Sequence, residues 1–111
     1  MLQSLINVER FGASDILSIC ALSKLRHLEL GDCANTPPSL FSSLCALGQL
    51  TSLRLERAQV SSQLGELSGL TKLRTLELVD VQLKKGFGDG MSKLNKLQYL
   101  LIIPDYKEEV I

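Results

Sequence analysis

The feature that most constrains this chain is a row of apolar residues that recurs at a nearly fixed interval. Within each row the spacings are three, three, three and two residues. The rows are Ile19, Leu22, Leu25, Leu28, Leu30; Leu44, Leu47, Leu50, Leu53, Leu55; Leu67, Leu70, Leu73, Leu76, Leu78; and Met91, Leu94, Leu97, Leu100, Ile102. Successive rows begin 25, 23 and 24 residues apart. Such a period is typical of proteins whose repeats stack on their neighbours.

The end of each row predicts a short β-strand. The pattern L-x-x-L-x-L closes with apolar residues two apart, and side chains in a strand alternate between its two faces. The leucines therefore face a core, and the residues between them face the other way. The three-residue spacing upstream suits a tight turn or a short helix packed over the same core. We expect an α/β fold.

This repeat resembles the leucine-rich repeat family, whose motif is L-x-x-L-x-L-x-x-N/C-x-L. The resemblance spans about residues 16–103 in four copies. It implies a right-handed solenoid, an arc with a parallel inner sheet of about five short strands and with short helices or turns on the convex side. The whole chain, 1–111, is then one domain. It comprises a degenerate repeat over about 1–24, repeats over about 25–49, 50–72 and 73–96, and a terminal strand and tail over 97–111.

The degenerate first repeat has two possible registers. In the first, Ile6, Val8 and Phe11 have the same spacing as Leu28, Leu30 and Cys33. An alternative register built on Leu2 and Leu5 would bury Asn7, so we prefer the first. The family's Asn/Cys position also departs from the motif, because it falls on Cys33, Ala58, Val81 and Asp105 and only Cys33 conforms. Loops that carry Ala or Val there need another source of hydrogen bonds.

The segments between the strands differ in their capping signals. Ser14 or Asp15 is suited to cap a first helix, and Thr36 precedes a proline pair suited to the first turn of a second helix. Residues 61–67 and the glycine-rich 84–90 are expected to form short helical turns at most, and 84–90 is expected to be a turn or irregular.

By the resemblance, the residues between the leucines line the concave face in columns across neighbouring strands. The candidate partner-binding residues on this face are His27, Glu29, Arg54, Glu77, Val79, Tyr99, Leu101 and Ile103. The alternating charges of Glu29, Arg54 and Glu77 are open to two interpretations: a solvated, self-neutralising ladder, or a polar stripe that selects a partner.

The outward positions become apolar at the C-terminal end, and we centre the expected binding surface on Tyr99, Leu101 and Ile103. A strand that is apolar on both faces is normally covered on both. The tail 104–111 could fold back, so that Val110 and Ile111 cover this patch, or another chain or a further part of the protein could cover it.

Catalytic, metal and cofactor sites are not predicted. His27 is the only histidine, so every Ser-His-Asp or Cys-His arrangement would depend on it. No set of three or four zinc ligands is apparent near it. Residues 86–90 lack the spacing of a phosphate loop. Cys20 and Cys45 occupy the same place in successive repeats, and we expect thiols unless their Cα atoms approach within about 7 Å.

Charge and hydropathy bear on the partners and the cellular location that can be expected. Twelve basic residues balance twelve acidic ones, so the excess of positive charge that attracts nucleic acid is missing. The chain has no run of 18 apolar residues, so a membrane-spanning helix is not predicted. No secretory signal and no cysteine-rich caps are visible, so we expect an intracellular, cytoplasmic location.

These observations predict a non-catalytic protein–protein interaction module. The alternative is a structural segment of a larger intracellular protein or assembly, such as the repeat arm of a ubiquitin-ligase substrate adaptor, although no adaptor-binding motif is present. The open N-terminal edge would then be covered by a second copy in a homo-oligomer or by flanking repeats.

Overall fold

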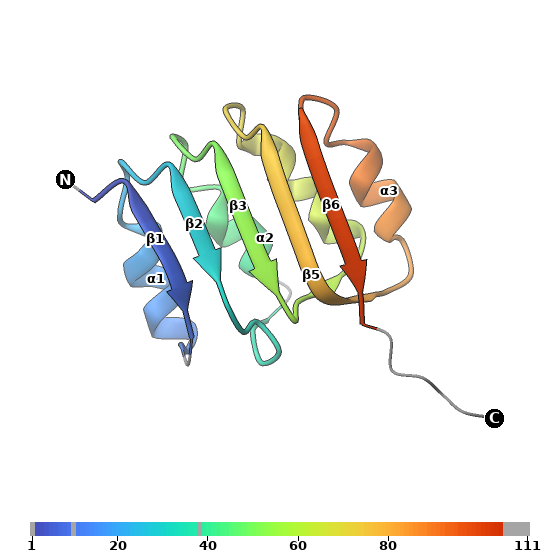
Figure 1. Cartoon of the computed structure of the whole chain (residues 1–111), viewed down its shortest axis with the longest axis horizontal. Helices are drawn as coiled ribbons and strands as arrows, with labels where there is room; N and C mark the ends of the chain where they lie inside the picture. The colour runs from blue at the N-terminus through green and yellow to red at the C-terminus, as the bar shows by residue number, and fades with distance from the viewer. Residues whose placement is uncertain (1, 10, 38, 106–111) are drawn as a thin grey trace.

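The computed structural model describes residues 2–9, 11–37 and 39–105, which form a mixed α/β structure built on a parallel sheet (Figure 1). The elements in chain order are β1 (Ser4–Val8), α1 (Ala13–Cys20), β2 (His27–Leu30), α2 (Leu40–Leu44), β3 (Ser52–Glu56), β4 (Gln59–Val60), the 3₁₀ helix η1 (Ser62–Gly69), β5 (Thr75–Leu83), α3 (Phe87–Ser92) and β6 (Tyr99–Pro104).

Five strands form the main sheet, in the order β1-β2-β3-β5-β6, and every neighbouring pair is parallel. The short β4 adds a second, two-residue pairing to the far end of β5. Figure 1 shows that the helices all lie behind the sheet, so that one face is covered and the other is open. We call the uncovered side the open face. The expected α/β class and five-stranded parallel sheet are confirmed.

The core is made by the leucine rows, as their spacing predicts. Leu28, Leu53 and Leu76 are register partners on neighbouring strands, as are Leu30, Leu55 and Leu78. All six are at most 1% exposed. Each fully buried leucine contributes roughly 1.5–3 kcal/mol relative to an exposed one. Side chains from the helical layer close the core from behind, including Phe41, Leu44, Leu64 and Leu67.

The first strand differs from the preferred register. Leu5 pairs with Leu28 and Val8 pairs with Leu30, with an irregularity between Leu5 and Val8. Leu5 packs against the core, whereas Ile6 is 57% exposed, so the prediction that Ile6 faces inward was wrong. A bulge of this kind places one extra residue in one strand. The two registers considered from the sequence are therefore each correct over half of β1.

The predicted helix caps were also wrong. Helix α1 is preceded by Gly12, whose backbone N–H donates to Asp15 Oδ2 at 2.7 Å. Asp15 therefore lies within the first turn and accepts a hydrogen bond from the residue before the helix. The helix begins at Ala13, earlier than a cap at Ser14 or Asp15 would allow. Thr36 does not cap α2, which follows Ser39; its hydroxyl donates to the Cys33 carbonyl at 2.7 Å and so stabilises the preceding loop.

The two later crossover segments are helical, as the expectation of short helical turns allowed, but both helices are longer than a single turn. The 3₁₀ helix η1 spans eight residues, and the glycine-rich segment forms helix α3. Gly90 explains this result, because a Cβ atom there would lie 2.9 Å from the Ser61 carbonyl oxygen and 3.1 Å from the Gly65 nitrogen. The glycine lets α3 approach the backbone at η1 closely, so it serves packing and not chain reversal.

Backbone hydrogen bonds to neighbouring strands and loops are made at Cys33, which fits the Asn/Cys position of the motif, and at Ala58 and Val81, which do not. Cys33 N–H donates to the Glu56 carbonyl at 2.8 Å, the Ala58 carbonyl accepts from Gln82 N–H at 3.0 Å, and the Val81 carbonyl accepts from Asp105 N–H at 2.8 Å. Cys33, Ala58 and Val81 are at most 1% exposed. Backbone bonds between repeats replace the missing side-chain bonds, and the small apolar residues extend the core.

Within the described residues, the helices lack the length and apolar character needed to cross a bilayer.

Candidate functional site on the open face of the sheet

The residues between the buried leucines align in columns across the open face. His27, Ser52, Thr75 and Tyr99 form one column of register partners; Glu29, Arg54, Glu77 and Leu101 form the next; Glu56, Val79 and Ile103 form the third. All eight predicted partner-binding residues lie in these columns. The structure therefore brings them together on one face, as the two-residue alternation of a strand requires.

Arg54 is the centre of a charged cluster on this face. Its guanidinium lies 2.6 Å from Glu56 Oε1, 3.2 Å from Glu77 Oε1 and 3.7 Å from Glu29 Oε1. The sequence argument identified Glu29 and Glu77 as partners but missed Glu56. Glu56 lies two residues from Arg54 on the same strand and hence on the same face, and this spacing was the signal that could have revealed it. We call these four residues the Arg54 cluster.

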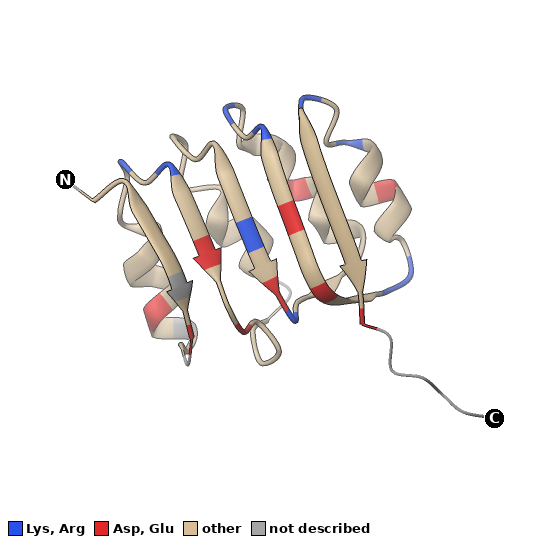
Figure 2. Ribbon diagram, in the orientation of Figure 1, with Lys and Arg blue, Asp and Glu red and all other residues tan. Residues whose placement is uncertain are grey.

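The Arg54 cluster is negative overall. One guanidinium faces three carboxylates, so the formal charge is +1 − 3 = −2. Desolvation by itself lowers the pKa of Arg54, but the hydrogen bonds that its guanidinium donates to Glu56 and Glu77, together with the negative charges of these carboxylates, outweigh it and raise that pKa. Figure 2 shows acidic, basic and acidic segments in turn across β2, β3 and β5. The four side chains are 29–38% exposed, so each pair contributes only a few tenths of a kcal/mol.

The open face becomes apolar at β6. Tyr99 is 50% exposed, Ile103 is 41% exposed, and Leu101 between them is half-buried. Figure 2 shows no charged segment on this strand. The predicted change from polar to apolar is confirmed. The predicted cover by Val110 and Ile111 falls outside the described residues.

The last row of the leucine pattern is less buried than the earlier rows, because Met91, Leu94, Leu97 and Ile102 are only partly buried and Leu100 is exposed. Leu100 pairs with the buried Leu76, yet it is 41% exposed. It faces the core side of the sheet, but within the described residues no strand lies beyond β6. Both faces of β6 are therefore apolar, as the sequence predicted, but the exposure of Leu100 on the core side was not predicted from the repeat pattern.

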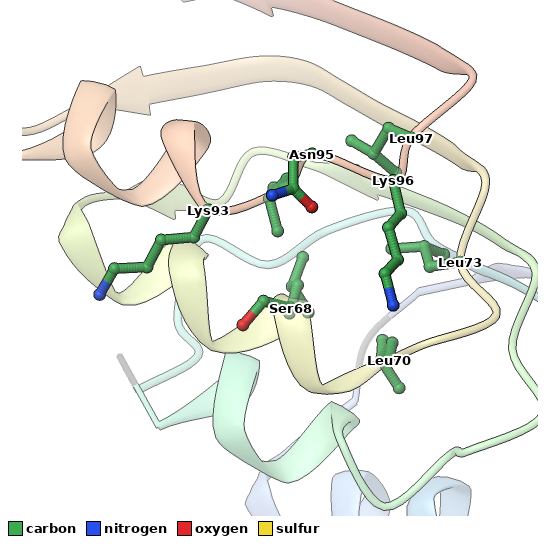
Figure 3. A pocket seen from close by; sticks show the side chains of 9 residues that line it. Ser68, Leu70, Leu73, Lys93, Asn95, Lys96 and Leu97 are labelled. Atoms are coloured by element: carbon green, nitrogen blue, oxygen red, sulfur yellow. The ribbon is translucent and has the colours of Figure 1, made fainter.

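A small hollow opens between the last two repeats, next to β6. Its volume is about 70 Å³, and Leu70, Leu73, Lys93, Asn95 and Leu97 are among its lining residues (Figure 3). Small-molecule sites usually enclose about 300–1,000 Å³. The hollow is therefore too small for a cofactor-sized ligand, and it marks incomplete packing at this end of the core.

The cysteines are free thiols. Burial raises the pKa of Cys33 to about 12, and it also raises the pKa of Cys20 and of Cys45. The Cys45 thiol donates to the Glu66 carbonyl at 2.9 Å. A thiolate is the reactive form, so raised pKa values are typical of structural thiols. His27 is exposed on the open face, and in the part of the chain that the structure describes no three His, Cys, Asp or Glu side chains are placed so that they could hold a metal ion together.

In comparisons with protein-family models, curated proteins and solved structures, nothing matches this chain.

Proposed function

We propose that this chain is a leucine-rich-repeat solenoid that acts as a non-catalytic protein-interaction module. The proposal rests on the difference between the two faces of the sheet. The leucine rows and the described helices occupy one face, while the other presents aligned columns that pass from the Arg54 cluster to the apolar residues of β6. A repeat scaffold that leaves such a face open is suited to bind another protein.

The chemistry of the face favours a partner that combines apolar and basic side chains. Tyr99 and Ile103 offer apolar surface, and the adjacent Glu77 belongs to a cluster with a formal charge of −2. Exposed aromatic side chains are the usual anchors of interfaces, and complementary charge sets orientation and association rate. We propose an intracellular partner of this kind, a setting that suits three free cysteines.

Charge reversal at Glu77 tests this proposal away from the edge of the sheet. The full chain would be used to capture proteins from cell extract, in parallel with Glu77→Lys and with Asp89→Lys, which reverses an exposed charge on α3. Proteins that bind the open face should be lost from Glu77→Lys, be retained by Asp89→Lys, and bind more weakly as salt rises. Equal capture by all three proteins would contradict the proposal. Circular dichroism would confirm that both variants are folded.

A second candidate is a structural role within a larger assembly, which the exposure of Leu100 and Ile103 on the two faces of β6 favours. In that case the surface would serve permanent packing, and the isolated chain would be less stable than its complex. Comparison of the unfolding midpoint alone and with a captured protein separates these roles: an obligate piece would gain strongly, whereas a free-standing binder would already be stable.

A further inference from the structure

The outer edge of β6 carries the features of a strand that pairs with another strand. The six residues Tyr99–Pro104 are uncharged, and both faces of the strand expose apolar side chains. Native proteins usually blunt an edge strand with charges, bulges or a covering element, because an unblunted edge recruits further strands. β6 has no charge of its own that would repel an identical strand.

Within the described residues, no strand pairs with the outer side of β6, so its backbone has hydrogen-bonding groups available there. Tyr99 N–H donates to the Arg74 carbonyl at 3.0 Å, which orients its backbone groups toward β5. Successive residues in a strand direct these groups to opposite sides, so the N–H and C=O groups of Leu100 and Ile102 point away from β5.

We propose that two copies of this chain pair through β6 in an antiparallel, two-fold symmetric manner. With Leu101 opposite Leu101 of the second copy, Leu100 lies opposite Ile102 and forms the hydrogen-bonded pairs. Tyr99 then lies opposite Ile103 on the open face, an aromatic and β-branched pair of the kind that stabilises sheets. This register pairs every apolar residue of 99–103 and leaves Pro104, which has no N–H, at the end of the ladder.

The same symmetry makes one continuous sheet. In this register the numbers of two paired residues sum to 202, so both are odd or both are even. Because side chains alternate along a strand, paired residues point to the same face. The open faces of the two copies therefore lie on one side of the joined sheet, and the helical layers lie on the other. The helical layers then meet beside the exposed Leu100, so the open ends of the two cores can cover each other. The other edge of the sheet is a poorer partner, because the bulge between Leu5 and Val8 interrupts β1.

The area involved predicts a weak dimer. Covering the exposed parts of residues 99–103 removes on the order of 350 Å² per copy, against roughly 800 Å² per partner in a standard interface. The dimer should therefore depend on concentration. This inference is independent of the proposed function, since a folded chain could pair through β6 without binding another protein.

Cysteine cross-linking of the full chain tests the register. In the proposed dimer the two Leu101 Cα atoms are about 4.5 Å apart, within the range of about 4.4–6.8 Å for a disulfide. Leu101→Cys should form a covalent dimer on mild oxidation, at least about tenfold more than Tyr99→Cys, whose own symmetry mate lies about four residues, or roughly 13 Å, away along the strand. The wild-type chain controls for its three native cysteines. Equal cross-linking of both variants, or of neither, would overturn the proposal.

Light scattering supplies a second test that needs no cysteine variant. Over a roughly hundredfold range of concentration, the mass of the wild-type chain should rise from 12.2 kDa toward twice that value. Leu101→Lys places like charges opposite each other and should remain monomeric, whereas Leu17→Lys, at a leucine that is 71% exposed on α1, should dimerise normally. Two results would refute the dimer. The first is a monomer at every concentration, which is expected if residues 106–111 cover β6. The second is the formation of open-ended oligomers that Leu101→Lys does not prevent.

Discussion

Replacing Gly88 and Gly90 by alanine, one at a time, tests whether α3 packs backbone to backbone on the preceding helical layer. Both glycines lie in the same helix, and neither has a positive φ. Alanine at Gly88 would meet no atom within 4 Å, so this substitution should stabilise the protein by about 0.4–1 kcal/mol through the unfolded state.

Alanine at Gly90 should have the opposite effect. Its Cβ would lie 2.9 Å from the Ser61 oxygen, 3.0 Å from the Ser62 oxygen and 3.1 Å from the Gly65 nitrogen. These are all backbone atoms, so no side-chain rotation relieves the overlap and α3 must move away. Overpacking of this kind costs about 1–3 kcal/mol. The two variants should then differ by about 2 kcal/mol.

Thermal and urea unfolding, followed by far-UV circular dichroism, measure this difference. For a chain of this size about 2 kcal/mol corresponds to a difference of roughly 10 °C in Tm. We expect Gly88→Ala to melt above the wild type and Gly90→Ala below it. If both variants melt at or above the wild-type temperature, α3 does not touch η1 closely, and the account of the glycine-rich segment is wrong.

Further predictions concern the core and the buried thiol. Leu53→Ala, at a residue with 0% exposure, should lower the free energy of unfolding by roughly 3–4 kcal/mol. Leu100→Ala, at the same repeat position but 41% exposed, should lower it by about half as much. Urea unfolding of dilute protein measures both losses, and equal losses would mean that β6 is covered. Stability should fall as pH rises from 9 toward 12, because the thiol of Cys33 ionises near its ordinary pKa of 9.0 when unfolded but only at about 12 when folded; Cys33→Ala should flatten this part of the pH profile, and an unchanged slope would show that other groups cause it.

The repeat spacing, together with its resemblance to leucine-rich repeats, predicted the sheet and its columns. Leucines at a constant offset must occupy equivalent places in parallel strands, so the pairing of Leu28 with Leu53 and of Arg54 with Glu77 followed directly. The candidate surface followed for the same reason, since side chains alternate strictly along a strand.

The remaining features depended on interactions that spacing does not encode. The bulge in β1 combines two registers, and no single periodic pattern represents both. The helix at Phe87–Ser92 forms because a glycine permits close contact with residues about 25 positions earlier, whereas local propensity alone disfavours it. The exposure of Leu100 depends on whether a further strand follows, and the row of leucines is identical in either case.

We propose that the exposed columns of the open face, and not the leucine rows, bind the partner. The most direct measurement is quantitative capture of binding proteins by the full chain and by Leu101→Glu and Leu17→Glu, which change the same residue type on the open face and on α1. We predict that Leu101→Glu loses the proteins that the wild type binds, while Leu17→Glu retains them. If Leu101→Glu remains folded and still captures the same proteins in the same amounts, the open face is not the binding surface.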